Sequence, residues 1–187
     1  MMSARAPLLE VEDLRTYFQM EGGTIHAVDG TSLTMHVGET LGVVGESGCG
    51  KSVMALSILG IVPSPGRIVG GRIRYYRGAG NGGEPVELSS LDPKGDAMRA
   101  IRGLDITMIF QEPKSALSPV YTIGQQIVEA LRLHRDLSRS QARQQVVEML
   151  GKVGLPDPER TIDRYPHQLS GGMCQRAMIA MALCSYP

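Results

Sequence analysis

Residues 45–52 read Gly45-Glu46-Ser47-Gly48-Cys49-Gly50-Lys51-Ser52 and match the pattern G-x-x-x-x-G-K-[S/T] at every fixed position. The apolar run before them, residues 40–44, predicts a buried strand, and residues 53–59 after them predict a helix. Strand, glycine-rich loop and helix in this order are the setting that the pattern requires. The chain is therefore predicted to be an α/β protein built around a phosphate-binding loop, and a glycine-rich turn that matches by chance is the alternative.

Each residue type in this loop suits the binding of a triphosphate. Gly45, Gly48 and Gly50 bring backbone amides against phosphate oxygens with no Cβ in the way. The positive end of the following helix adds to the attraction for an anion. Lys51 supplies a point charge for the β- and γ-phosphates, and the Ser52 hydroxyl is an oxygen ligand of the kind that Mg²⁺ prefers.

Length and composition narrow the class of protein. At 187 residues the chain is long enough for one domain with a substantial core. Nineteen basic and nineteen acidic residues cancel, which argues against a nucleic-acid binder. No apolar run reaches the roughly 18 residues needed to cross a bilayer, and residues 1–8 lack the apolar centre of a signal peptide, so we expect a soluble cytoplasmic protein. Three cysteines are too few and too irregularly spaced for a disulfide framework or a zinc site.

The N-terminal part is predicted to form a small antiparallel sheet. Residues 8–14 alternate as a half-buried strand, and residues 24–37 alternate on both sides of Asp29-Gly30, which suggests two strands joined by a turn there. Tyr17 and Phe18 fall in the predicted loop after the first strand. Either aromatic ring could stack on an adenine, or it could simply cover an edge of the core.

The middle of the chain predicts a further strand, a turn and a short helix. Residues 67–76 read as a strand, the glycine-rich run 78–83 as a turn, and residues 92–102 as a helix capped by Asp92. Residues 106–110 read as a buried strand that ends at Gln111. Because strand ends in open α/β sheets present polar side chains to ligands, Gln111 is a candidate contact for a metal ion or water.

Helices dominate the rest of the sequence. Residues 122–154 carry two apolar stripes at helical spacing, and Ser138 to Gln141 form a capping box that begins the second helix. These helices are predicted to form an inserted helical subdomain. Ser170, Gly171 and Gly172 then precede an apolar helix that runs to residue 184. This corner could favour an anion through its hydroxyl and exposed amides, or Ser170 could serve only as a helix N-cap.

The loop, Gln111 and the serine-glycine-glycine corner, in this order and with a helical insert before the corner, resemble the nucleotide-binding subunit of ABC transporters. The resemblance covers the whole chain. Residues 45–52, the phrase Met-Ile-Phe-Gln at 108–111, and Tyr-Pro-His-Gln-Leu-Ser-Gly-Gly-Met at 165–173 are similar to the dipeptide/oligopeptide/nickel importer branch in particular.

The resemblance implies a role for each matching residue. It implies that Phe18, or with weaker support Tyr17, stacks on adenine beside Val28, and that Gln111 reaches Mg²⁺ and the attacking water, while residues 112–121 face membrane subunits. It further implies that a signature segment closes over the γ-phosphate held by a second subunit; its residues are Leu169, Ser170, Gly171, Gly172 and Met173. Methionine stands at the fifth signature position, where most of the wider family has glutamine.

The sequence also departs from the family after residue 183. Family members continue into an apolar strand that ends in an aspartate and a glutamate, followed by a histidine, and these do not follow here. We therefore expect a partial nucleotide-binding domain, incomplete at its C-terminus and with negligible turnover as it stands. Its expected parts are a β layer and loop core at 1–110, a helical subdomain at 111–168 and the signature segment with its helix at 169–187.

The predicted function is that of the ATP-binding subunit of an importer for di- or oligopeptides or nickel. The implied ligands are ATP and Mg²⁺, the latter at Ser52 and Gln111. The implied partners are a second ATP-binding subunit, membrane permease subunits and, indirectly, a solute-binding protein, at the cytoplasmic face of the plasma membrane. The alternatives are a soluble ATPase of the same type working in DNA repair or translation, and a truncated module that only binds nucleotide.

Overall fold

The computed structural model describes residues 6–78 and 84–187, so most of the turn predicted at 78–83 lies outside the described residues. The chain divides into two compact units, Met1–Arg99 and Ala100–Pro187. Each unit has its own buried core and is described by itself below.

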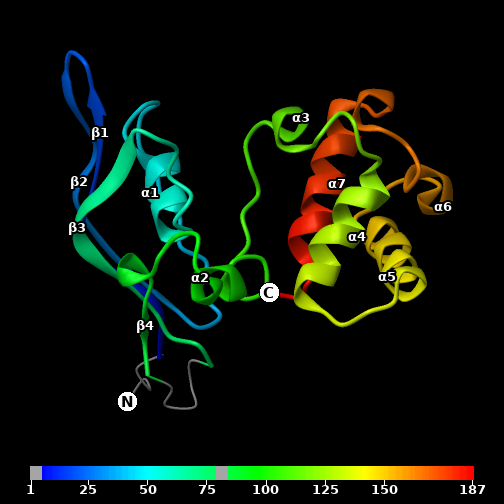
Figure 1. Ribbon diagram of the computed structural model, residues 1–187, viewed down its shortest axis with the longest axis horizontal. Coiled ribbons are helices and arrows are strands. Elements are labelled where there is room, and N and C mark those ends of the chain that lie inside the picture. Colours follow the sequence, from blue (N-terminus) through cyan, green and yellow to red (C-terminus); the bar gives the residue numbers. More distant parts are fainter. Residues whose placement is uncertain (1–5, 79–83) are drawn as a thin grey trace. The chain divides into compact units, whose positions relative to one another are not determined.

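The first unit is an antiparallel sheet with a helix packed against it. Its strands β1 (Pro7–Met20), β2 (Gly23–His36), β3 (Gly66–Tyr75) and β4 (Val86–Glu87) lie in the order β2-β1-β3-β4. Helix α1 (Lys51–Ile58) follows the glycine-rich loop and contacts β1 and β2 (Figure 1). The predicted antiparallel layer and the predicted strand at 67–76 are confirmed. Side chains from β1, β3 and the segment after β4 fill the core, among them Val11, Leu14, Ile73 and Met98.

The β1–β2 hairpin differs from the prediction in two ways. Residues 24–37 are not two strands joined at Asp29-Gly30, because β2 runs unbroken from Gly23 to His36. The register against β1 instead shifts near Leu14, where Gly30 has φ +75° and faces the side chain of Asp13, itself at φ +47°. The glycine thus serves a β-bulge and not a turn. Tyr17 and Phe18 lie within β1, so their predicted loop position is wrong as well.

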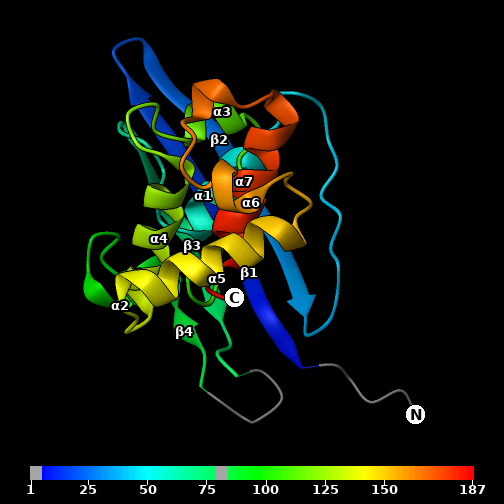
Figure 2. The same ribbon diagram turned by 90° about the vertical axis from the view of Figure 1, so that its right-hand side faces the viewer.

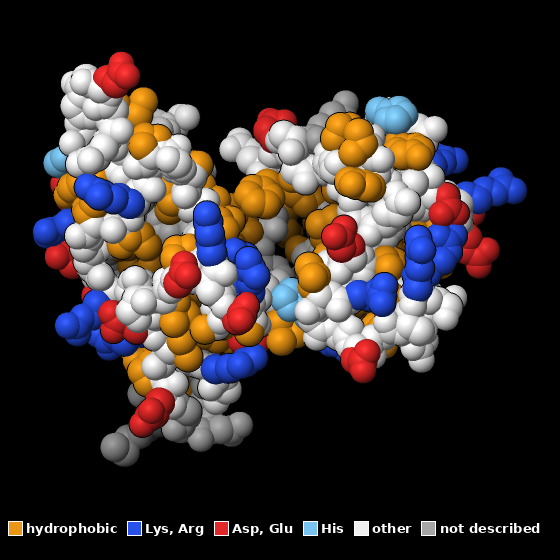
Figure 3. Space-filling model, in the orientation of Figure 1, with side chains coloured by type: hydrophobic (Ala, Val, Ile, Leu, Met, Phe, Trp, Pro, Cys, Tyr) orange, Lys and Arg blue, Asp and Glu red, His pale blue; other side chains and the backbone are white. Residues whose placement is uncertain are grey.

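Two segments predicted as buried strands are not strands. Residues 40–44 have no strand partner among the described residues, and Val44 is 93% exposed. Residues 106–110 form one isolated bridge, between Arg102 and Ile106, and Ile109 is 49% exposed. A strand needs hydrogen-bonded neighbours, and the apolar pattern of a segment does not supply them. Hydrophobic side chains consequently lie at the surface of both units, among charged ones (Figure 3).

The chain after β4 first forms two short helices. They are the 3₁₀ turn η1 (Leu88–Ser90) and helix α2 (Asp96–Ile101). The helix predicted to begin at Asp92 therefore begins four residues later. The Asp92 carboxylate accepts a hydrogen bond from the amide of Lys94, and the amide of Gly95 donates to the Asp92 carbonyl, so Asp92 starts a tight turn ahead of the helix.

The second unit is a helical bundle. It contains α3 (Pro113–Ala116), α4 (Ile123–His134), α5 (Arg139–Lys152), α6 (Pro158–Thr161), η2 (Pro166–Gln168) and α7 (Gly171–Leu183). The predicted capping box at Ser138 is confirmed, and Thr122 forms a second one with Gln125 at the start of α4. In Figures 1 and 2, α4 runs alongside α7, whereas α5 crosses both.

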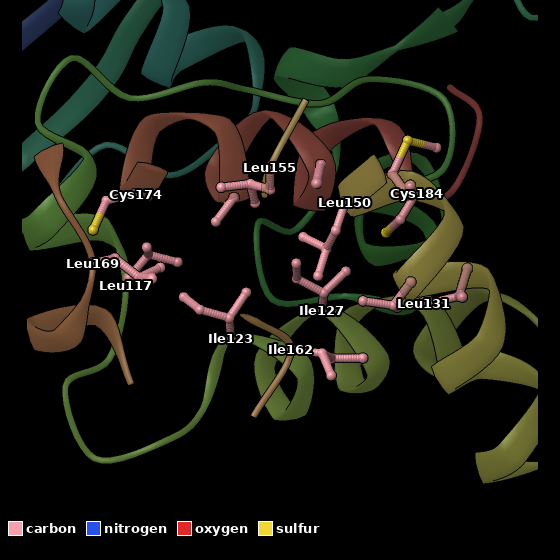
Figure 4. Packing of buried hydrophobic residues seen from close by; sticks show 14 of the residues in the cluster. Leu117, Ile123, Ile127, Leu131, Leu150, Leu155, Ile162, Leu169, Cys174 and Cys184 are labelled. Carbon is pink, nitrogen blue, oxygen red and sulfur yellow. The ribbon is translucent and has the colours of Figure 1, made fainter. Parts of the chain in front are cut away.

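One hydrophobic cluster holds these helices together. The predicted stripe residues Ile123, Ile127 and Leu131 of α4 are fully buried and meet α5 and α7 (Figure 4). Fully burying one such side chain stabilises a fold by about 1.5–3 kcal/mol. The remaining labelled members of the cluster are Leu117, Leu150, Leu155, Ile162, Leu169, Cys174 and Cys184.

Candidate functional site

The glycine-rich loop turns tightly and ends at the first residue of α1. Gly48 and Gly50 have φ values of +85° and +93°, which favour glycine. Gly50 is the N-cap of α1, and its carbonyl accepts a hydrogen bond from the amide of Met54 at 2.9 Å. The first amides of α1 lack partners within the helix, so the loop and the helix end together expose donors suited to an anion.

The Lys51 ammonium folds back over this loop. Its Nζ donates to the carbonyls of Gly45 at 2.8 Å and Glu46 at 2.7 Å, and to Cys49 Sγ at 3.3 Å. Three donors are all that an ammonium has. The positive charge is therefore fixed beside the loop amides, where a phosphate would have to compete for it with two carbonyl oxygens.

A hollow of about 190 Å³ lies between the loop and strand β2. Its volume suits a phosphate group or a small part of a nucleotide. The residues that line it come from β2, from the segment before the loop, from the loop itself and from α1; they are Val28, Thr31, Val43, Val44, Cys49, Gly50, Lys51 and Met54.

Strand β2 lies directly against the loop at Gly50. A Cβ on Gly50 would lie 2.0 Å from the carbonyl oxygen of Ala27 and 3.5 Å from Cγ2 of Val28. The structure thus places Val28, for which the resemblance implies a contact with the adenine base, against the end of the phosphate loop. Ala27 was missed, because a contact through a backbone carbonyl leaves no mark on the identity of the residue that makes it.

Phe18 and Tyr17 have different surroundings on β1. Phe18 is half-buried, and its ring packs so closely on Gly66 that a Cβ there would lie 2.5 Å from Cε1. The Tyr17 ring stacks on His26 at a centroid distance of 4.0 Å, and its hydroxyl donates to Asp29 at 2.7 Å. This hydrogen bond raises the pKa of Tyr17 and lowers the pKa of Asp29. The ring and the hydroxyl of Tyr17 therefore both have partners within the sheet.

In the second unit, Gln111 is exposed and lies just ahead of α3. The segment that carries it is not the predicted strand, so its position rests on the turn into α3 and not on a sheet edge. Ile109 and Phe110 before it, and Val120 and Tyr121 after α3, are exposed hydrophobic residues.

The signature segment forms the start of α7. Ser170 is the N-cap, and its hydroxyl accepts a hydrogen bond from the amide of Met173 at 3.3 Å. Leu169 is buried in the helical core, whereas Gly171 and Gly172 have no heavy atom within 4 Å of an added Cβ. The Ser-Gly-Gly corner therefore presents a hydroxyl and open backbone to the outside of the unit. The cap role and an anion-binding role both remain compatible with this geometry.

The side chains around the loop offer a hard cation such as Mg²⁺ only oxygen atoms as suitable ligands. No group of three or more histidine, cysteine or carboxylate side chains gathers within the described parts of the chain. The exposed hydroxyl of Ser52, in the first turn of α1, is an oxygen ligand of the type that Mg²⁺ takes together with phosphate oxygens and water. This chemistry fits a magnesium ion that arrives with a phosphate ligand.

Comparison with known proteins identifies the family. The protein-family model described as ABC transporter matches residues 28–187, from the strand beside the loop to the last residue. The chain belongs to the ABC transporter family. It has the fold of an ABC cassette, with an antiparallel N-terminal sheet and a helical unit. It is 26% identical, with a TM-score of 0.79, to the dimeric structure of the bacterial ABC transporter cassette MJ0796, covering 96% of this chain and 71% of that one.

Curated ABC relatives are more similar in sequence. A Brucella ovis protein named for peptide import and ATP binding is 49% identical over 98% of this chain and 53% of its own length. The dipeptide transport ATP-binding protein DppD of Bacillus subtilis is 46% identical over 96% of this chain and 51% of its own length. This cassette chain spans about half the length of the curated relatives it matches. Within its described residues, no helix combines the length and apolar character that a bilayer crossing requires.

Proposed function

We propose that this chain forms part of an ATP-binding subunit of a peptide importer, in which ATP binding and hydrolysis drive transport. The single observation that carries the proposal is the Lys51 ammonium, held over the loop amides at the start of α1. The names of the relatives, peptide import and dipeptide transport, support the solute class. Nickel, which the same family branch also carries, is the second candidate solute.

The loop residues would act by positioning and by charge. Backbone amides of residues 45–52 would donate to the phosphate oxygens, and Lys51 would exchange its two carbonyl partners for oxygens of the β- and γ-phosphates. Such charge-assisted hydrogen bonds are among the strongest available to a protein. Ser52 would be an oxygen ligand for Mg²⁺, which when bound would neutralise charge on the phosphates. From the family resemblance alone, we assign Gln111 a contact with Mg²⁺ and with the attacking water.

We assign the adenine contact to Phe18, with Val28 beside it. Tyr17 is the weaker candidate, because His26 covers one face of its ring and Asp29 holds its hydroxyl. Phe18 has no such polar partner, and Val28 lies against Gly50 at the end of the loop. A base stacked near Phe18 and phosphates at the loop would span the edge of the β1–β2 hairpin.

We further propose that the signature segment serves a second subunit. The open corner at Ser170, Gly171 and Gly172 would meet the γ-phosphate bound by another copy or by a homologous subunit. A dimeric cassette is described for the structural relative MJ0796, which supports such pairing. Permease subunits at the cytoplasmic face of the membrane, with a solute-binding protein beyond them, complete the proposed assembly.

The 187 residues contain no acidic pair at the end of an apolar strand downstream of the signature segment. We propose that these 187 residues by themselves bind nucleotide but turn it over negligibly, because none of their carboxylates stands at the family's position for polarising the attacking water. Purified chain that hydrolyses ATP at an ordinary enzymatic rate, with the Lys51→Ala variant silent, would refute this part of the proposal.

Titration with ATP and Mg²⁺ tests nucleotide binding directly. Isothermal calorimetry on the wild-type chain, on Lys51→Ala and on the matched control Lys94→Ala, an exposed lysine of the same unit, separates the loop ammonium from charge in general. We expect Lys51→Ala to weaken ATP binding by about tenfold or more, because it removes a charged hydrogen bond worth about 1.5–3 kcal/mol. Lys94→Ala should leave the affinity unchanged. Equal ATP affinity in all three proteins would reject the proposed site.

A further inference from the structure

Two hydroxyl groups are buried together between β1 and α1. Thr16 Oγ1 lies 2.8 Å from Ser57 Oγ, and the two residues are 0% and 2% exposed. Ser57 Oγ also donates to the carbonyl of Val53 at 2.7 Å, one turn earlier in α1. A hydroxyl has one proton, so Thr16 must be the donor of the pair. The result is a directed chain of hydrogen bonds from β1 through Ser57 to the backbone of α1.

This pair completes a closed set of contacts that joins β1, β2, the end of the phosphate loop and α1. Thr16 is the cross-strand partner of Val28 on β2. Val28 and Ala27 lie against Gly50, and Gly50 is the N-cap of α1, whose seventh residue is Ser57. The hairpin therefore touches the nucleotide loop at one end of α1 and is tied to the same helix by the hydroxyl pair further along it.

The position of Thr16 in β1 adds a second feature. The β1–β2 register shifts between Thr16 and Tyr17, directly before Phe18. Register irregularities of this kind re-aim the side chains that follow them. Thr16 is thus the last residue of β1 before this shift, and Phe18 and Val62 both lie against Gly66, which follows α1 in the chain.

A purely structural contact would not need these hydroxyls. Valine and alanine would fill almost the same space without a buried polar group, and a buried hydroxyl that loses its partner costs about 1–3 kcal/mol. A hydrogen bond also fixes distance and direction, which an apolar contact does not.

We propose that the Thr16–Ser57 pair is a positioning contact that sets the β1–β2 hairpin against the phosphate-loop helix and so determines how well the site recognises the nucleoside part of ATP. This inference rests on the proposed function, since it takes the loop as the phosphate site and Phe18 as the base contact. Thr16 and Ser57 themselves touch no ligand.

The test compares ATP with inorganic tripolyphosphate, both with Mg²⁺, because only ATP carries a base. Affinities are measured for the wild type, Thr16→Val, Ser57→Ala, the double variant and the control Thr16→Ser, which keeps the hydroxyl. We expect each single variant and the double variant to lower the ratio of ATP affinity to tripolyphosphate affinity by about threefold or more. Thr16→Ser should retain the wild-type ratio.

Thermal unfolding of the same proteins separates positioning from stability. Ser57→Ala leaves the buried Thr16 hydroxyl without its partner and should melt earlier, whereas Thr16→Val leaves Ser57 its hydrogen bond to Val53 and should cost less. The double variant removes both hydroxyls and should recover most of the loss seen in Ser57→Ala. The inference is supported if the double variant regains stability while its affinity ratio stays low. It is overturned if the ratio recovers together with stability, if neither single variant changes the ratio, or if the wild type binds both ligands equally. Failure of the wild type to bind either ligand would instead overturn the proposed function.

Discussion

Gly50 and Gly48 adopt the same backbone region but differ in their surroundings. A Cβ on Gly48 would meet no heavy atom within 4 Å, whereas one on Gly50 would lie 2.0 Å from the Ala27 carbonyl oxygen. Gly48→Ala should cost only the strain of a positive φ, about 1 kcal/mol. Gly50→Ala must also push β2 away from α1, and we expect a loss of about 3 kcal/mol or more in unfolding free energy. Urea unfolding followed by circular dichroism measures both, and equal losses would mean that β2 does not contact the loop.

Cys49 differs from the other two cysteines in exposure. It is exposed in the loop, whereas Cys174 and Cys184 are buried, and burial raises the pKa of the Cys184 thiol and so keeps it protonated. A thiol reagent should therefore modify one cysteine of the folded chain rapidly and two slowly. Because Cys49 Sγ lies beside the Lys51 ammonium, modification should abolish nucleotide binding, and ATP with Mg²⁺ should slow it.

Mass spectrometry locates the modified residue in that experiment. The variant Cys49→Ser supplies the control, since it should keep nucleotide binding and lose the rapid phase. Labelling of Cys49 at one rate with and without nucleotide would argue that phosphate does not occupy the loop.

At the scale of elements, α5 is tied to the segment after α6 by one bidentate ion pair. Arg143 donates to both carboxylate oxygens of Asp163, at 2.9 and 2.8 Å. These hydrogen bonds hold the pKa of Asp163 below its usual value, so the pair contributes stability above the unfolded pKa near 3.9 and loses it as the pH falls through the lower folded value. Both side chains are largely exposed, which limits the contribution to about 1 kcal/mol or less.

Asp163→Asn should therefore destabilise the chain slightly at pH 7, and the difference from wild type should shrink as the pH falls below about 4. Urea unfolding at several pH values and at low salt measures this difference. Asp136→Asn, which changes another exposed carboxylate of the same unit, is the matched control. A difference that grows towards low pH would contradict the sign of the shift.

Helices and strands differed in how far the sequence alone determined them. The apolar stripes at Ile123, Ile127 and Ala142, Val146 and the capping box at Ser138 are local, and each led to a helix in the predicted place. Residues 40–44 and 106–110 carry an equally clear apolar pattern, yet a strand depends on neighbours that may be far away in sequence. The predicted turn at Asp29-Gly30 was wrong for a related reason, because these two residues are compatible with both a turn and a bulge.

The same distinction holds for the candidate site. The loop and its helix follow from one continuous motif, and Val28 was proposed by resemblance as a neighbour of the base. The contacts that join β1, β2 and α1 around the loop, at Ala27, Thr16 and Ser57, come from three separate segments. Serine and threonine are common in every environment, so nothing in their identity marks these two as a buried pair.

At the scale of the whole molecule, segments whose backbone amides are hydrogen-bonded alternate along the chain with segments whose amides are not. Strands β1 and β3 form a ladder over buried side chains, and α4 and α5 enclose the helical core. Across the described residues, the amides of Leu41 to Val44 and of Thr107 to Phe110 donate to no backbone carbonyl. Exchange protection requires a hydrogen bond that persists between openings of the structure.

Amide hydrogen exchange of the 187-residue chain should therefore show two windows of sequence in which the amides exchange rapidly. We expect residues 41–44 and 107–110 to exchange within seconds at neutral pH, whereas Val11, Ile73, Leu131 and Leu150 remain protected for far longer. The contrast tests the structure at the two places where it departs from the apolar pattern of the sequence. Strong protection of either window would mean that the segment pairs as a strand after all, with a partner in another copy of the chain as the first candidate, and dilution would then remove the protection.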